Sequence, residues 1–352
     1  MYTQIQKNST IVIGLMAAAT VLATASLSVG AVDIPLSDAL SILLNKIGNH
    51  PLSESAERYA VVLLDIRVPR VLLAAIVGAS LGVSGAALQG LFRNPLVEPG
   101  LIGVSSGAAL AAVVVIVFGA SLPPFWAEIA GTYLLPLFAF GGGLAVTLAA
   151  YRFGKQNGQT NIALLILSGI AFNALAGALI GLVIYHADDE ALRNYTFWSM
   201  GDLSGASGKR LLLCLPFIVA PSLVILRSRK ALNAIALGEK EAYHLGVNVE
   251  RVKRTVIVCA AMAVGASVAL TGMIGFVGLV VPHIIRTAFG PDHKIVLPAS
   301  LPGGALLLIG ADMAARTVVS PAELPIGIVT SLLGAPFFIY LLMKTKKKTS
   351  LN

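Results

Sequence analysis

Few residues of this chain have the types and spacing that chemistry requires. The tripeptide Gly208-Lys209-Arg210 lacks the upstream spacing of the GxxxxGK[ST] phosphate loop, so it does not form an ATP-binding motif. The stretch GVSSG at 103–107 and His283 have the residue types of an intramembrane serine protease. However, His283 lies in VVPHIIR, where a packed residue is the better explanation. The sequence therefore predicts a chain that is not an enzyme.

The composition is that of a membrane protein. Hydrophobic residues make up 57% of the chain, charged residues only 12%, and the mean hydropathy is +0.86. Ordinary globular domains contain about 25% charged residues. Runs of about 20 apolar residues are long enough to cross a hydrocarbon core of about 30 Å. Such runs must be helical, because lipid offers no partner to an unpaired backbone group. We expect an all-α polytopic membrane protein with one transmembrane domain over 1–352.

The apolar runs predict ten membrane spans. The eighth is short and follows the seventh through TGMIGF, so this pair could be tilted or re-entrant. Cys214 and Cys259 both lie in spans, where packing is expected rather than a disulfide or a metal site. The predicted spans are 11–32, 70–91, 100–119, 128–152, 161–185, 209–227, 254–274, 276–289, 295–313 and 326–343.

Basic residues set the expected orientation. With the N-terminus inside, 17 of the 25 Lys and Arg residues fall in inward-facing segments, which satisfies the positive-inside rule. Both termini are then expected in the cytoplasm. The net charge of +8 is explained by this topology and by contact with anionic lipid headgroups, not by nucleic-acid binding.

The inward segment 228–253 contains a charged, helix-like stretch, ALGEKEAYHLG at 236–246. On a helix, Leu237, Glu241 and Leu245 would share one face with Ala242 beside them, while Gly238 and Gly246 would break the helix on either side. Such a helix could present a rigid knob to a soluble partner. It could equally be a solvated connector between two spans, and periodicity alone does not decide between these interpretations.

Two further polar stretches interrupt the spans. In LFRNPLVEPGLIGVSSG at 91–107, prolines stop helices and small residues follow, which predicts a tight turn and a closely packed helix. In DIRVPR at 65–70, Arg67 and Arg70 could bind carboxylates on the outer side, or they could anchor the helix to headgroups. Arg316 is a third outer arginine, and Asp312 four residues earlier could neutralise it.

With these segments in order, residues 60 to 343 resemble the permease subunits of bacterial ATP-driven importers for iron-siderophores, haem and cobalamin, the type II ABC importers. The resemblance is carried by four stretches of sequence. They are RVPRVLLAAIVGASLGVSGAALQGLFRNPLVEPGLIGVSSGAAL, ALGEKEAYHLGV, ALTGMIGFVGLVVPHIIR and ADMAARTVVSPAELPIGIVTSLLGAPFFIYLL.

The resemblance implies a complex in the bacterial inner membrane with a second permease subunit, expected to be identical. Two cytoplasmic ABC ATPase subunits would bind ATP and Mg²⁺, and a periplasmic binding protein would deliver the substrate. This chain itself would hold no cofactor and no metal. The 236–246 stretch is then similar to the coupling helix that enters the ATPase, with Leu237, Gly238, Glu239, Glu241, Ala242, Leu245 and Gly246 as the coupling residues.

The resemblance also assigns the other candidate residues. Arg67, Arg70 and Arg316 map to the surface that docks acidic side chains of the binding protein. The translocation path is expected along span five, and its candidates are Gln89, Ser105, Ser168, Asn173 and Arg193. Asn173 could instead make a helix–helix hydrogen bond, and Arg193 could instead pair with Asp189 or Glu190. The cytoplasmic gate maps to QTNIAL, with Thr160 and Asn161 as its candidates.

Substrate and mechanism leave alternatives open. The TFWSMG run after span five is similar to the haem and ferric-chelate members, so haem or a ferric siderophore is the expected cargo and cobalamin the alternative. An ion-coupled secondary transporter is the alternative from another class. Such carriers usually bury carboxylates near mid-membrane, whereas Glu98, Asp312 and Glu323 fall near span ends. This distribution favours an ATP-driven importer that works by alternating access.

Overall fold

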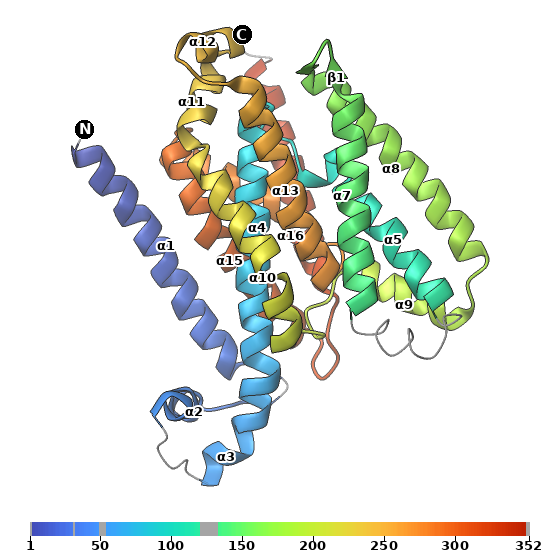
Figure 1. Cartoon of the computed structure of the whole chain (residues 1–352). Coiled ribbons are helices and arrows are strands. Elements are labelled where there is room, and N and C mark those ends of the chain that lie inside the picture. Colours follow the sequence, from blue (N-terminus) through green and yellow to red (C-terminus); the bar gives the residue numbers. More distant parts are fainter. Residues whose placement is uncertain (1, 31, 49–53, 120–132, 350–352) are drawn as a thin grey trace.

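The computed structural model describes residues 2–30, 32–48, 54–119 and 133–349. The chain folds into a bundle of helices with one two-residue β-hairpin (Figure 1). The order is α1 Tyr2–Ser28, α2 Leu36–Gly48, α3 Glu54–Val61, a π-helical turn Val62–Arg67, α4 Val68–Leu91, a 3₁₀ turn Pro99–Ile102, α5 Val104–Phe118, α7 Leu135–Phe153, β1 Lys155–Gln156, β2 Gln159–Thr160, α8 Ile162–Tyr185, α9 Asp189–Ser199, α10 Gly208–Arg227, α11 Arg229–Leu237, α12 Glu239–His244, α13 Val249–Thr271, α14 Val277–Phe289, α15 His293–Thr317 and α16 Ile326–Thr349.

Each of the ten predicted spans contains a helix. Seven helices in the described part are long and apolar enough to cross a membrane, and α5, α14 and the described apolar part of α16 are shorter apolar helices. The predicted boundaries were wrong in places. The third span becomes helical only at Val104, after the 3₁₀ turn, and the seventh begins at Val249 rather than 254. The start predicted for the fourth span, at 128, lies outside the described residues.

The bundle has two distinct ends. The end that carries α12, the hairpin, the beginning of α1 and the end of α16 is called the inner end below (Figure 1). The opposite end carries α2, α3 and α9 and is called the outer end (Figure 1). The beginning of the first helix and the end of the last helix therefore lie at the same end as the basic segment 228–253. The helix α2, which was not predicted, lies beside the outer part of α1.

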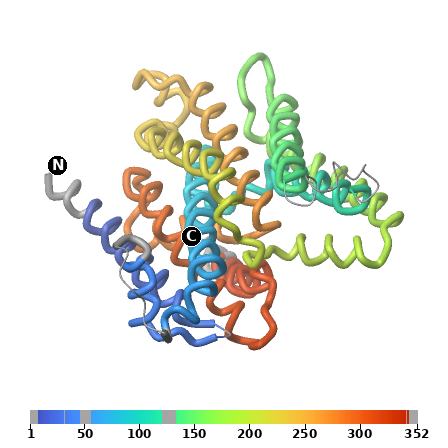
Figure 2. The backbone as a smooth tube through the Cα atoms, turned by 60° about the horizontal axis from the view of Figure 1, so that its bottom comes forward, coloured from blue at the N-terminus to red at the C-terminus, as the bar shows by residue number. Residues whose placement is uncertain are grey.

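The core of the bundle surrounds α4. This helix packs against α10, α13, α14 and α15, and in Figures 1 and 2 it runs through the middle of the molecule. Two glycines allow its neighbours to approach closely. A Cβ atom on Gly82 would lie 2.3 Å from the Ser300 carbonyl oxygen of α15, and one on Gly85 would lie 1.9 Å from that of Gly278 on α14. Backbone contact of this kind is how helices associate in lipid, where the hydrophobic effect does not drive them together.

A second group of helices, α5, α7, α8 and α9, stands beside this core (Figures 1 and 2). The long helix α8 of this group is largely exposed within the chain, because only Leu165, Gly169 and Ala176 are buried along 24 residues. Large apolar side chains on its outer surface, such as Leu167 and Leu182, are 63% and 60% exposed. Such a surface requires lipid or another membrane-embedded chain as its neighbour.

Replacing Gly82 with leucine is expected to lower the thermal unfolding temperature in detergent. The added side chain would meet the α15 backbone, which cannot retreat without opening the core, and overpacking costs about 1–3 kcal/mol. Gly14→Leu on α1 is the matched control, since a Cβ atom there would meet nothing within 4 Å. An equal shift in both variants would contradict the proposed contact.

Candidate functional site

The 236–246 stretch forms an exposed structure at the inner end. The expected break at Gly238 is present, since this glycine has φ 141° and ψ 151° and separates α11 from α12, but the expectation that Leu237 lies on the same helix as Glu241 was wrong. Leu237 and Glu241 therefore do not share a face of one helix. Leu237, Tyr243 and Leu245 are 71%, 73% and 65% exposed, whereas Ala242 is fully buried. Three exposed apolar side chains among charged neighbours form a surface suited to another protein.

Polar contacts hold α11 in place against α15. The Asn233 amide donates to the Asp292 carboxylate at 2.6 Å, and the His293 backbone N–H donates to the Asn233 side-chain oxygen at 2.9 Å. Burial by itself would raise the pKa of Asp292, but hydrogen bonds from Lys294 and Asn233 hold this pKa below its usual range. The carboxylate therefore stays charged and keeps the α11–α15 contact polar. These contacts give the exposed surface a fixed base.

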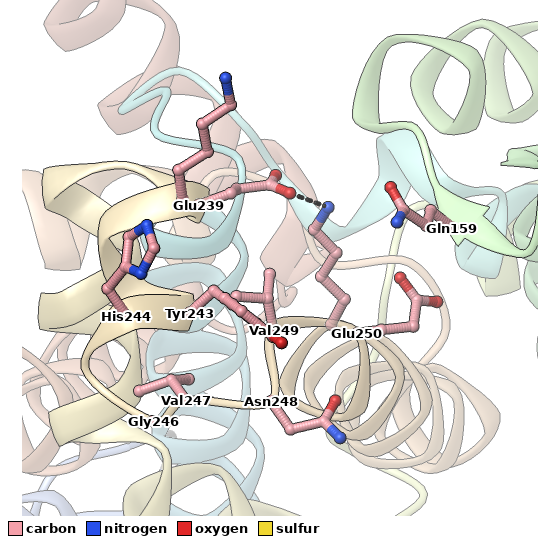
Figure 3. A pocket seen from close by; sticks show the side chains of 11 residues that line it. Gln159, Glu239, Tyr243, His244, Gly246, Val247, Asn248, Val249 and Glu250 are labelled. Atoms are coloured by element: carbon pink, nitrogen blue, oxygen red, sulfur yellow. Dashed lines mark hydrogen bonds and ion pairs between the residues drawn. The ribbon is translucent and has the colours of Figure 1, made fainter.

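A cavity of about 1000 Å³ opens beside α12 (Figure 3). Side chains of α12 line one side and Glu250 and Gln159 line the other (Figure 3). Glu239 reaches across from α12 to accept a hydrogen bond from Lys253 of α13 at 2.8 Å, the dashed line in Figure 3. The Lys253 ammonium also donates to the Thr160 carbonyl oxygen at 2.9 Å. One buried cation thus joins three elements.

The two gate candidates lie next to this cavity. Thr160 is buried, and its backbone N–H donates to Glu250 at 2.9 Å, while its hydroxyl also donates to Glu250. Asn161 caps the N-terminus of α8, since its side-chain oxygen accepts hydrogen bonds from Ala163 and Leu164. Tyr151 donates to Glu250 at 3.1 Å. The gate role of Thr160 and Asn161 stays a prediction.

Glu250, Lys253 and Tyr151 were not among the predicted site residues. Sequence reasoning placed Lys253 in a connector and began the seventh span at 254, which hid its place on a long helix. A signal was present, because Glu250 and Lys253 are three residues apart at the beginning of an apolar run. Residues at this spacing share one helical face.

At the outer end, the three predicted docking arginines bind groups of their own chain. Arg67 donates to the carbonyl oxygens of Leu27, at 2.6 Å, and Val32. Arg316 donates to the Val29 carbonyl oxygen at 2.9 Å and to the Ser26 hydroxyl at 2.6 Å. Both arginines thereby satisfy carbonyls at and beyond the C-terminal end of α1, where a helix leaves its own acceptors unpaired.

Arg70 joins two carboxylates in the same outer cluster. It lies 2.8 Å from Asp312 and 2.8 Å from Glu323. Arg316 pairs with Asp312 at 3.1 Å, which confirms the expected i,i+4 pair. Arg67, Arg70 and Arg316 are only 5%, 7% and 6% exposed. Their docking role stays a prediction. A binding protein would have to compete with the internal partners of these arginines.

Asn173 and Ser106 connect α8 to the segment that includes α5. The Ser106 hydroxyl donates to the Asn173 side-chain oxygen at 2.5 Å, and the Asn173 amide donates to the Gly100 carbonyl oxygen at 3.2 Å. This is the helix–helix hydrogen bond that was one of the two interpretations of Asn173. Ser105 and Ser168 are half-buried, and their place on the path stays a prediction.

Gln89 differs from expectation, whereas the path role of Arg193 stays a prediction. Gln89 is 2% exposed and donates to the carbonyl oxygens of Val97 and Gly278 while it accepts from Arg286, so it lies inside the core of its own chain. Its predicted place on a path wall is therefore wrong in this conformation. Arg193 is exposed on α9. Within the described ranges it makes no ion pair with Asp189 or Glu190.

A polytopic helical bundle with an exposed surface for a soluble protein at its inner end is the architecture expected of a membrane transport permease. Residues 18–344 match the FecCD transport family. The chain belongs to this family, and it is the permease subunit of an ATP-driven importer and a multi-pass inner-membrane protein. Family membership excludes the alternative of an ion-coupled secondary transporter.

Similar proteins include permeases with different named cargoes. The chain is 47% identical over 287 residues to the hemin transport system permease protein HmuU of Yersinia pestis, covering 82% of this chain and 84% of that protein. It is 42% identical over 286 residues to the cobalamin import system permease protein BtuC of Halobacterium salinarum, covering 81% and 74%. A solved structure described as an inward-facing conformation of a metal-chelate type ABC transporter matches with a TM-score of 0.79 and 33% identity, covering 96% of this chain and 99% of that one.

Proposed function

We propose that this permease carries haem, or a closely related iron chelate, from the periplasm to the cytoplasm. The observation that carries the proposal is the 47% identity with a hemin transport permease over more than four fifths of both chains. Cobalamin is the second candidate, supported by 42% identity with a cobalamin permease. The same proposal assigns ATP and Mg²⁺ to a separate ATPase subunit and substrate delivery to a periplasmic binding protein.

We further propose that a second copy of the chain packs beside α8, with the path between the copies. The exposed apolar surface of α8 supports this arrangement, since it needs an apolar neighbour. Both termini are then cytoplasmic, because the beginning of α1 and the end of α16 lie at the inner end with α12 (Figure 1). The exposed residues Leu237, Tyr243 and Leu245 face the ATPase in this assembly.

The cargo is tested in proteoliposomes that contain the permease with its cognate ATPase and binding protein. We expect ATP-dependent uptake of haem, and no uptake by the permease alone under an ion gradient. Cobalamin and a ferric siderophore are assayed in parallel. Uptake of cobalamin without haem would reject the haem proposal in favour of the second candidate.

Replacing Leu245 with glutamate is expected to weaken ATPase binding by about 30-fold, because an apolar residue central to an interface contributes about 2 kcal/mol in favourable cases. The affinity of purified ATPase for the permease in nanodiscs measures this effect. Phe289→Glu is the control, since Phe289 is an apolar residue at the inner end and is 40% exposed. Equal affinities of the Leu245 variant and the unaltered chain would remove Leu245 from the interface.

The docking role of the outer arginines can be tested by removing an internal partner or one of the arginines and measuring association with the binding protein. Glu323 is 43% exposed and competes for Arg70, so Glu323→Gln should speed association with an acidic binding protein, mainly at low salt. Arg67→Gln should slow it. Glu190→Gln on α9 has the same charge change as Glu323→Gln and is the control. Association rates from surface plasmon resonance that do not differ between the two glutamate variants would argue against docking by these arginines.

A further inference from the structure

Lys253 is a buried cation with partners on two other elements. It is 3% exposed, and its ammonium lies 2.8 Å from the Glu239 carboxylate and 2.9 Å from the Thr160 carbonyl oxygen. A buried charge is costly unless it is paired and hydrogen-bonded. The geometry around this ammonium is therefore held tightly, since loss of either partner leaves it underpaired.

All three polar groups of Thr160 form hydrogen bonds with residues of α13. Its carbonyl accepts from Lys253, and its N–H and hydroxyl both donate to Glu250, one turn earlier on the same helix. The next residue, Asn161, caps α8. The chain that enters α8 is thus attached to the first turns of α13, and a displacement of α13 must displace the beginning of α8.

Glu239 connects this attachment to the ATPase-facing surface. It is the first residue of α12, and its side chain is 40% exposed on one side of the cavity while its carboxylate holds Lys253 on the other (Figure 3). The α11 helix is fixed against α15 through Asn233, as described above. A displacement of α12 is therefore transmitted through the Glu239–Lys253 ion pair to α13 and to Thr160.

We propose that Glu239, Lys253 and Thr160, with Glu250, form a relay that moves the beginning of α8 when the ATPase engages α12. Within this relay they are positioning residues, since they act by moving α8. The relay rests on the proposed docking of an ATPase at α12. It does not depend on which cargo the importer carries.

The test measures the accessibility of the first turn of α8 in the assembled complex. Ala163 is exposed there, so Ala163→Cys is introduced after Cys214→Ser and Cys259→Ala. A water-soluble maleimide then reports its modification rate with and without Mg²⁺ and a non-hydrolysable ATP analogue. We expect the nucleotide to change this rate at least about fivefold, the lower end of typical couplings between sites.

Lys253→Met and Glu239→Gln should each abolish this nucleotide response while ATP hydrolysis by the complex persists. Lys253→Arg should retain it, because the arginine keeps the charge and the donors. Lys294→Met removes an exposed inner-end lysine outside the relay and should leave the response unchanged. If Lys253→Met fails to assemble, Glu239→Gln decides, since its side chain is partly exposed.

The relay is rejected if the response persists in both Lys253→Met and Glu239→Gln, or if the complex without relay substitutions shows no response. A complex that fails to import haem but retains the nucleotide response would overturn only the proposed cargo. If the ATPase does not bind the unaltered chain, the proposed docking of the ATPase at α12 is overturned instead. The three proposals therefore fail in distinguishable ways.

Discussion

Lipid offers no hydrogen-bond partner, and this constraint determines how the chain uses its few polar groups. Each buried charge must find its partner within the protein or in another chain of the complex. Arg70 and Arg316 share Asp312 at the outer end, and Lys253 binds Glu239 and Thr160 at the inner end. The pair of Arg70 with Asp312 joins α4 to α15, and the pair of Lys253 with Glu239 joins α13 to α12, so each of these two pairs fixes one helix relative to another.

The two ends use this pairing differently. At the outer end, Arg67 and Arg316 hold the carbonyls that end α1, so their cations stabilise a static junction of α1 with the core. At the inner end, Glu239 remains partly exposed and lies on a helix of only six residues. An incoming protein can reach the carboxylate of this pair, as it can reach Glu323 in the outer pair with Arg70, whereas Arg67 and Arg316 hold backbone carbonyls of α1 and its end.

Much of the helix arrangement was predictable because apolar length alone identifies a membrane span. The break at Gly238 was also predictable, because glycine readily adopts the backbone angles that end a helix, but periodicity wrongly placed Leu237 on the same helix as Glu241. The burial of the outer arginines depends on contacts between α1 and α15, some 290 residues apart in the chain, which local sequence does not encode. The Thr160 network required knowing that the α13 helix begins at Val249, and helix beginnings are the least certain feature of a hydropathy pattern.

Packing indicates which helix yields to a force at the inner end. The central helix α4 buries 19 of its 24 residues and meets α14 and α15 backbone to backbone at its glycines. The helix α8 buries 3 of 24. Segments with few buried contacts move at lower free-energy cost than those in the core. Since Thr160 ties the beginning of α8 to α13, contacts within the chain resist a displacement of α8 less than one of α4, so in the proposed relay the α4 core serves as the fixed body against which α8 moves.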